Sequence, residues 1–191
     1  GDAIEPAPRK PGRVVTEGFM YRHHAQTARI QALIADGAIG QLRTIASAFT
    51  FTLAREADVR LDRALGGGSL WDVGCYPVSL AQLLAGASPR AVSAMRRDGP
   101  TGVDEMFAGT IAYENGVTCQ FHCGFRAAHQ AYLRLVGTEG VLDVHRPFRP
   151  EPREHLLLMR GGQVEEVVVE GAPVFVDEVA DMEDAALGIR A

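Results

Sequence analysis

The chain has 191 residues, 47% of them hydrophobic and 23% charged, so it can bury one core and is neither disordered, collagen-like nor a coiled coil. Its net charge of −5 comes without a basic stripe, which argues against nucleic-acid binding. No apolar run approaches the roughly 20 residues of a membrane span and no secretory signal is visible, so we expect a cytoplasmic protein without a membrane partner.

The first part of the chain predicts one short helix between two strands. Residues 1–12 hold three prolines and no apolar period, which indicates a linker or an irregular leading segment. Residues 13–20 are rich in β-branched side chains and favour a strand. Residues 24–35 carry apolar side chains at helical spacing and are followed by Gly37, a residue typical of helix ends. Residues 42–53 alternate apolar side chains with Thr and Ser, as in a strand with one covered face.

A charged loop and a glycine run then precede a second helix. Residues 55–63 are expected to form a loop or lid. The glycines at 66–68 permit a tight turn, and Ser69 after them is a good N-cap. Because Pro77 cannot donate a backbone hydrogen bond, the helix is expected to kink or restart there.

From Pro89 onward the sequence predicts a meander of strands. The expected strands are residues 91–96, 106–113, 117–125, 131–137, 141–144, 155–160 and 163–169. Residues 114–116 and 160–162 are strong hairpin turns, and residues 174–190 read as an amphipathic helix. The fold class is therefore α+β, with a large, mostly antiparallel, open-faced sheet and helices packed on one face.

The other face of this sheet requires a cover or contact with solvent. Phe107, Ile111 and Phe121 stand among small and polar residues on the predicted strands. We therefore expect a homo-oligomer, at least a dimer, that forms through the sheet face.

Asp72 and Tyr76 are the first candidates for chemistry. Their spacing of four places both side chains on one helical face, just after the glycine run. A carboxylate and a phenol there can bind sugar hydroxyls or relay a proton. By spacing alone, a capping Asp and a core Tyr are the commoner interpretation of such a pair.

Residues 21–24, Tyr-Arg-His-His, follow a predicted strand, where open sheets tend to place ligand contacts. Adjacent histidines point in different directions and are poor partners for one metal ion. A polar strand exit with one solvated imidazole is the simpler interpretation.

The cysteines do not indicate a metal site. On a strand, Cys119, Phe121 and Cys123 point to one face and His122 to the other, so no tetrahedral ligand set closes locally. Together with Cys75 they are expected to be free thiols in a reducing compartment. No metal site is predicted.

Other polar residues offer weaker signals. Arg126, His129 and Arg134 are candidates for contact with an anionic or hydroxyl-rich ligand, although charged strand ends are usually only solvated. Asp104 and Glu105 are adjacent on a strand and diverge too much to share a proton. The sequence contains no GxGxxG after a strand, no P-loop, no HExxH and no GxSxG.

Four ordered motifs resemble the C-terminal part of the Gfo/Idh/MocA oxidoreductase family, in the branch of xylose-type and trans-dihydrodiol dehydrogenases. They are EGFMYRHHAQTARIQALIADGAIGQLRTI at 17–45, GGGSLWDVGCYPVSLAQLL at 66–84, VDEMFAGTIAYENGVTCQFHCGFR at 103–126 and LVGTEGVLDVHRPF at 135–148. The resemblance covers about residues 13–190 and implies one α+β domain over residues 13–191.

The resemblance also implies roles for individual residues. Family enzymes join an N-terminal Rossmann domain for NAD or NADP to this domain, whose open sheet commonly forms the oligomer interface. By this likeness Tyr76 handles the proton, Asp72 positions the substrate, and Tyr21 and Arg22 lie near the nicotinamide end of the site. The substrate would be a sugar or a diol.

The sequence departs from the family pattern upstream of these motifs. The family's Glu-Lys-Pro motif has no match, since Lys10 lacks the preceding Glu and lies too close to residues 13–20. The Rossmann domain is absent from this chain, and residues 13–20 would be the last strand of its sheet. Tight binding of NAD or NADP to this chain is not expected.

Three hypotheses follow. The first is a substrate-binding and oligomerisation domain of an NAD(P)-dependent dehydrogenase, inactive as this isolated chain. The second is a cofactor-free binding or assembly module derived from that family. In the third, another chain supplies the Rossmann half.

Overall fold

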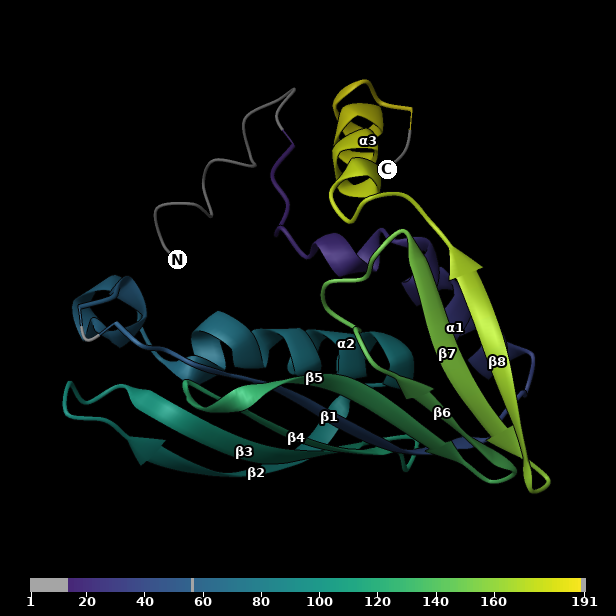
Figure 1. Cartoon of the computed structure of the whole chain (residues 1–191), viewed down its shortest axis with the longest axis horizontal. Helices are drawn as coiled ribbons and strands as arrows, with labels where there is room; N and C mark the ends of the chain where they lie inside the picture. The colour runs from purple at the N-terminus through teal and green to yellow at the C-terminus, as the bar shows by residue number, and fades with distance from the viewer. Residues whose placement is uncertain (1–13, 56, 190–191) are drawn as a thin grey trace.

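One mixed sheet of eight strands organises the structure, a computed structural model that describes residues 14–55 and 57–189 (Figure 1). The strands are β1 (Leu42–Thr52), β2 (Pro89–Asp98), β3 (Asp104–Tyr113), β4 (Thr118–Gly124), β5 (Arg126–Gly137), β6 (Gly140–Val144), β7 (Arg153–Arg160) and β8 (Gln163–Glu170). Their order in the sheet is β2-β3-β4-β1-β5-β6-β7-β8. Neighbouring strands are antiparallel except β1 and β4, which run parallel. The predicted large, mostly antiparallel sheet is confirmed.

The helices gather on one face of this sheet. They are η1 (Met20–Arg22), α1 (Ala25–Ala35), η2 (Val59–Leu61), η3 (Arg63–Leu65), the π-helical turn η4 (Leu70–Gly74), α2 (Cys75–Ala85) and α3 (Val176–Ala186). Figure 1 shows α2 lying along the sheet, and it packs against β1 and β4, whereas α1 packs against β8. None of the described elements covers the opposite face. The predicted α+β architecture with helices on one side is confirmed.

The start of α1 is set by a buried histidine. The Nδ1 atom of His24 accepts a hydrogen bond from the backbone N–H of Gln26 at 3.1 Å, which caps the first turn. Its other ring nitrogen, Nε2, donates to the carbonyl oxygen of Ala172 at 3.1 Å. His24 is therefore a structural cap and is fully buried.

The predicted hairpin turns are present. Residues 114–116 join β3 to β4, and Gly116 donates its N–H to the carbonyl oxygen of Tyr113. Gly161 and Gly162 join β7 to β8 with φ angles of 59° and 78°, a region in which L side chains are strained. The turns fix the register of the strands on either side.

The described residues of the strand predicted for 13–20 do not form a strand. Residues 14–19 have no regular structure, and Met20 begins a 3-10 turn. A strand exists only where a neighbouring strand completes its hydrogen bonds, and none of the described strands lies beside this segment. Its place in the sheet of a separate nucleotide-binding domain stays a prediction, and residues 1–12 lie outside the described part of the chain.

Two of the large apolar side chains of β3 and β4 are buried. Ile111 and Phe121 are only 8% and 7% exposed, and both belong to the core beneath α2. Phe107 stacks on Phe121 at a ring-centroid distance of 6.1 Å. Little of Ile111 and Phe121 is therefore exposed on the open face, although Phe121 still lines the groove there together with Tyr132.

An aromatic cluster joins four distant segments of the chain. Phe148, which is fully buried, stacks on Phe49 with ring centroids 5.3 Å apart and an interplanar angle of 13°. It also meets Tyr21 at 5.8 Å and Tyr76 at 5.7 Å. The loop after β6, strand β1, η1 and α2 are thereby held together by ring contacts.

We expect Phe148→Ala to lower the free energy of unfolding by about 3–5 kcal/mol, because it opens a cavity between these four segments. Urea denaturation followed by circular dichroism measures the change. The matched control is Phe175→Ala, since Phe175 is 51% exposed just before α3 and its removal leaves no cavity. Equal losses for the two variants would contradict the assignment of Phe148 as the central contact.

Candidate functional site

Asp72 and Tyr76 line one cleft of about 340 Å³ beside the aromatic cluster. The other lining residues come from η1, β1, the loop before the glycine run, β5 and the loop after β6: Met20, Phe49, Phe51, Arg60, Val73, His129 and Arg149. The cleft is thus apolar on its floor and charged along its walls. The spacing argument that paired Asp72 with Tyr76 agrees with this geometry, while their chemical roles stay predictions.

The turn that carries Asp72 is a π-helical turn capped by a distant carboxylate. Asp104 Oδ2 accepts hydrogen bonds from the backbone N–H of Leu70 at 2.7 Å and from Ser69 Oγ at 2.8 Å. The sequence predicted Ser69 as the N-cap, but its side chain makes no capping hydrogen bond. Asp104 accepts the hydrogen bond from the Leu70 N–H at the start of this turn instead. Isolated π turns in helices are frequent at functional sites.

Close packing explains why two positions of this segment, 67 and 74, are occupied by glycine. A methyl group on Gly74 would lie 2.7 Å from Sγ of Cys123, so only glycine lets the π turn approach β4. A methyl group on Gly67 would lie 2.6 Å from the carbonyl oxygen of Arg60. The glycine run therefore packs closely against the backbone of the loop that carries Arg60.

Arg60 lines the cleft, although the sequence did not single it out. Its Nε donates to Asp72 Oδ2 at 2.8 Å, and its Nη1 lies 3.3 Å from Asp58 Oδ1. The hydrogen bond to Asp72 raises the pKa of the Arg60 guanidinium. The loop over residues 55–63 has no sequence pattern that marks this contact, since the partner is twelve residues away.

Tyr76 is half-buried, and its environment keeps the phenol protonated. Burial raises the pKa of Tyr76, and the nearby Cys75 and Asp72 raise it further, whereas Arg149 lowers it. A neutral phenol at neutral pH can donate its proton to a substrate oxygen. The T-shaped contact with Phe49, at 5.5 Å, holds its ring against the cleft floor.

The other predicted site residues lie outside the cleft. Tyr21 is fully buried beneath Tyr76, with ring centroids 5.9 Å apart, and Arg22 is exposed. Burial raises the pKa of Tyr21 to about 12. Met20, one residue earlier, is the member of this segment that lines the cleft. Tyr21 therefore packs beneath Tyr76, because the 3-10 turn directs its side chain into the core. His23 pairs with Asp181 of α3 at 2.6 Å.

Of the three basic residues noted on β5, one lines the cleft and the other two form ion pairs. Arg126 forms an ion pair with Glu105 at 2.6 Å, and Arg134 forms one with Asp143 at 2.7 Å. Only His129 of the three reaches the cleft. Asp104 and Glu105 point to different partners, as their adjacency on a strand implied.

The thiols are unsuited to catalysis. Cys119 and Cys123 are buried, and burial raises the pKa of each to about 12. Burial likewise raises the pKa of Cys75 to about 11. Within residues 14–55 and 57–189, no three His, Cys, Asp or Glu side chains converge as metal ligands. No helix in the same ranges combines the length and hydropathy that crossing a membrane requires.

The glycine run at 66–68 differs from a dinucleotide-binding loop. The glycine run at 66–68 packs on the carbonyl oxygens of Arg60 and Asp62, so its backbone cannot cradle a pyrophosphate. The chain also lacks the GxGxxG loop that opens a helix in nucleotide-binding folds.

Comparison with known proteins identifies several relatives of this chain. The chain is 35% identical over 74% of its length to D-xylose 1-dehydrogenase (NADP(+)) 2 of Haloferax volcanii, and covers 43% of that protein. It is 34% identical over 80% of its length to the dTDP-3,4-didehydro-2,6-dideoxy-alpha-D-glucose 3-reductase of Streptomyces violaceoruber, covering 45% of it. The chain thus spans about half the length of the curated relatives it matches.

A solved structure matches the whole fold. The 3-ketoreductase from Actinomadura kijaniata, in complex with NADP and TDP-benzene, superposes with a TM-score of 0.91 at 27% identity. The match covers 98% of this chain and 58% of that one. The model of the GFO/IDH/MocA C-terminal domain matches residues 27–143. The resemblance seen in the four motifs is confirmed, and the chain belongs to the GFO/IDH/MocA oxidoreductase family, of which it is the C-terminal domain.

Proposed function

We propose that this chain is the substrate-binding domain of an NAD(P)-dependent oxidoreductase that acts on a CH–OH group of a sugar or a diol. The observation that carries the proposal is the convergence of Asp72 and Tyr76 on one cleft. The relatives add the substrate class, since their names include D-xylose and a dTDP-linked sugar. These names leave open whether the substrate is neutral or charged.

We assign different roles to Tyr76 and Asp72. Tyr76, kept protonated by burial, donates its proton to the substrate oxygen in the reducing direction. In the oxidising direction the phenolate form of Tyr76 accepts the proton that the substrate hydroxyl loses. Asp72, oriented by Arg60 at 2.8 Å, accepts a hydrogen bond from a neighbouring hydroxyl through its remaining oxygen lone pairs. The rings of Phe49 and Phe51 form an apolar floor.

In the proposed enzyme a separate nucleotide-binding domain holds NAD or NADP, which supplies the hydride chemistry. That domain belongs either to a longer form of this protein or to another chain. The free thiols of the described cysteines fit a cytoplasmic location. The 191-residue chain alone is expected to be inactive and to bind neither dinucleotide tightly.

We expect the purified chain to show no NAD(P)-dependent turnover of sugars or diols until a nucleotide-binding domain is joined to its N-terminus. The domain of the Haloferax volcanii relative is a suitable donor. In the fused protein, Tyr76→Phe should lower kcat by about 10²–10⁴-fold, because the proton donor is lost. Absorbance at 340 nm measures turnover.

The matched control is Tyr113→Phe, which removes a buried phenolic oxygen far from the cleft and should leave kcat unchanged. Turnover by the chain alone that Tyr76→Phe abolishes would contradict its expected inactivity. Full activity of the fused Tyr76→Phe variant would contradict the role of Tyr76.

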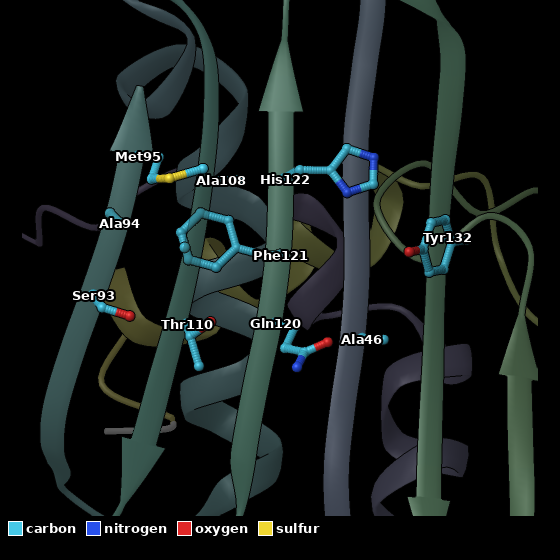
Figure 2. Close-up of a pocket in the computed structure, with 11 residues that line it drawn as sticks. Ala46, Ser93, Ala94, Met95, Ala108, Thr110, Gln120, Phe121, His122 and Tyr132 are labelled. Atoms are coloured by element: carbon cyan, nitrogen blue, oxygen red, sulfur yellow. The ribbon is translucent and has the colours of Figure 1, made fainter. Parts of the chain in front are cut away.

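The open face of the sheet supports a second role, assembly. Figure 2 shows small and polar side chains, together with the rings of Phe121 and Tyr132, around a shallow groove on the open face. Its main members are Ala46, Ser93, Met95, Ala108, Thr110, Gln120, His122 and Tyr132. Met95 is 79% exposed at its rim. Small side chains let a second sheet approach closely, which favours a homo-oligomer through this face.

A cofactor-free assembly module would use the same face without the cleft. Native mass spectrometry of the chain with sugars and dinucleotides distinguishes the two functions. A stable dimer that binds neither class of ligand would favour the assembly module over the substrate domain.

We expect wild-type protein to be at least dimeric in size-exclusion chromatography with light scattering, and Ala108→Glu to be monomeric. The substitution places an unpaired carboxylate in the centre of the open face, where burial against a partner is costly. Ala180→Glu on exposed α3 is the matched control and should remain oligomeric. A monomeric wild type would remove the proposed interface.

A further inference from the structure

We infer that the substrate carries an anionic group, which Arg149 and His129 bind on the cleft wall beside Tyr76. The inference rests on the proposed function and adds to it the charge of the substrate. Its basis is the pairing of charges around the cleft, the buried backbone on either side of Arg149, and the presence of both side chains in the cleft lining.

The two arginines of the cleft differ in their partners. Arg60 is held between Asp58 and Asp72 and is therefore compensated. Arg149 makes no ion pair or hydrogen bond with the residues that the structure describes. Arg149 is therefore the guanidinium of the cleft lining that has no carboxylate partner among the described residues.

The loop between β6 and β7 presents Arg149 in a fixed position. The preceding residue, Phe148, is fully buried in the aromatic cluster, and Pro147 and Pro150 are also buried. The carbonyl oxygen of Arg146 accepts a hydrogen bond from Gln26 Nε2 at 3.0 Å. The backbone on either side of Arg149 is therefore buried or hydrogen-bonded, whereas its side chain is exposed.

Arg146, a second arginine of the same loop, has a structural role. Arg146 donates to Glu151 at 2.6 Å and to Glu154 at 3.0 Å, and Glu154 is buried. Its guanidinium therefore stabilises the loop. Arg149, three residues later, has no such carboxylates and lines the cleft instead.

Arg149 acts directly on the centre of the cleft. Burial raises the pKa of Tyr76, and Asp72 and Glu178 raise it further, whereas the positive charge of Arg149 lowers it. His129 reaches the same cleft from β5 and meets Phe49 edge-on at 6.4 Å. A guanidinium fork and an imidazole N–H together suit a carboxylate or a phosphate oxygen.

Three ligands, each with a different anionic group, test which kind of anion the cleft binds. D-gluconate carries a carboxylate, D-glucose 6-phosphate a phosphate monoester, and dTDP-glucose a diphosphate. D-glucose is the neutral reference. Isothermal titration calorimetry of the full chain at low and at high salt measures each affinity, because charge-dependent binding weakens as salt is added.

We expect at least one anionic ligand to bind about tenfold to hundredfold more tightly than D-glucose, as a charge-assisted hydrogen bond provides. Arg149→Gln should remove this difference, Arg149→Lys should restore part of it, and His129→Gln should reduce it by less than Arg149→Gln. Arg153→Gln is the matched control, since Arg153 pairs with Glu170 on the surface and its loss changes the net charge equally. Circular dichroism verifies that every variant is folded.

The outcomes separate the inference from the proposed function. Binding of D-glucose as tight as that of every anionic ligand, or an unchanged preference in Arg149→Gln, would overturn the inference and leave the substrate domain in place. Absence of binding by all four ligands would contradict the substrate domain itself, and the inference with it.

Discussion

The contact of Phe148 with Phe49, Tyr21 and Tyr76 is the interaction on which the site depends. These rings come from four segments that are far apart in the chain, and none of the segments could hold its position alone. Aromatic rings fix both distance and orientation, because they pack edge-on or offset rather than in arbitrary ways. The same cluster that forms part of the core therefore also forms the floor beneath the phenol of Tyr76.

A second constraint is the close approach of the π turn to the sheet. Asp104 satisfies the free N–H of Leu70, and Gly74 permits contact with Cys123. Together they place Asp72 at the mouth of the cleft, where Arg60 orients its carboxylate. Catalytic groups need support of this kind, since a shift of about 1 Å can cost a hundredfold in rate.

Much of the fold was predictable from local patterns. Alternation along β1 and β4, the helical spacing in α1, and the glycines of the β7–β8 turn each reflect short-range backbone preferences. The predictions that were wrong concern residues whose local structure depends on contacts with distant parts of the chain. Residues 14–19 need a neighbouring strand, and Ser69 lost its capping role to Asp104, which is 35 residues away. Local sequence does not encode such competition.

The sequence was sufficient for the order of elements, the face shared by Asp72 and Tyr76, and the family, because these follow from spacing and from ordered motifs. Only the tertiary structure decided that Arg60 and Arg149 join the cleft and that Tyr21 lies beneath it. The physical reason is that charge pairing depends on distances between residues remote in sequence. Two arginines with similar local surroundings, Arg146 and Arg149, differ in role because one meets two carboxylates and the other faces the cleft.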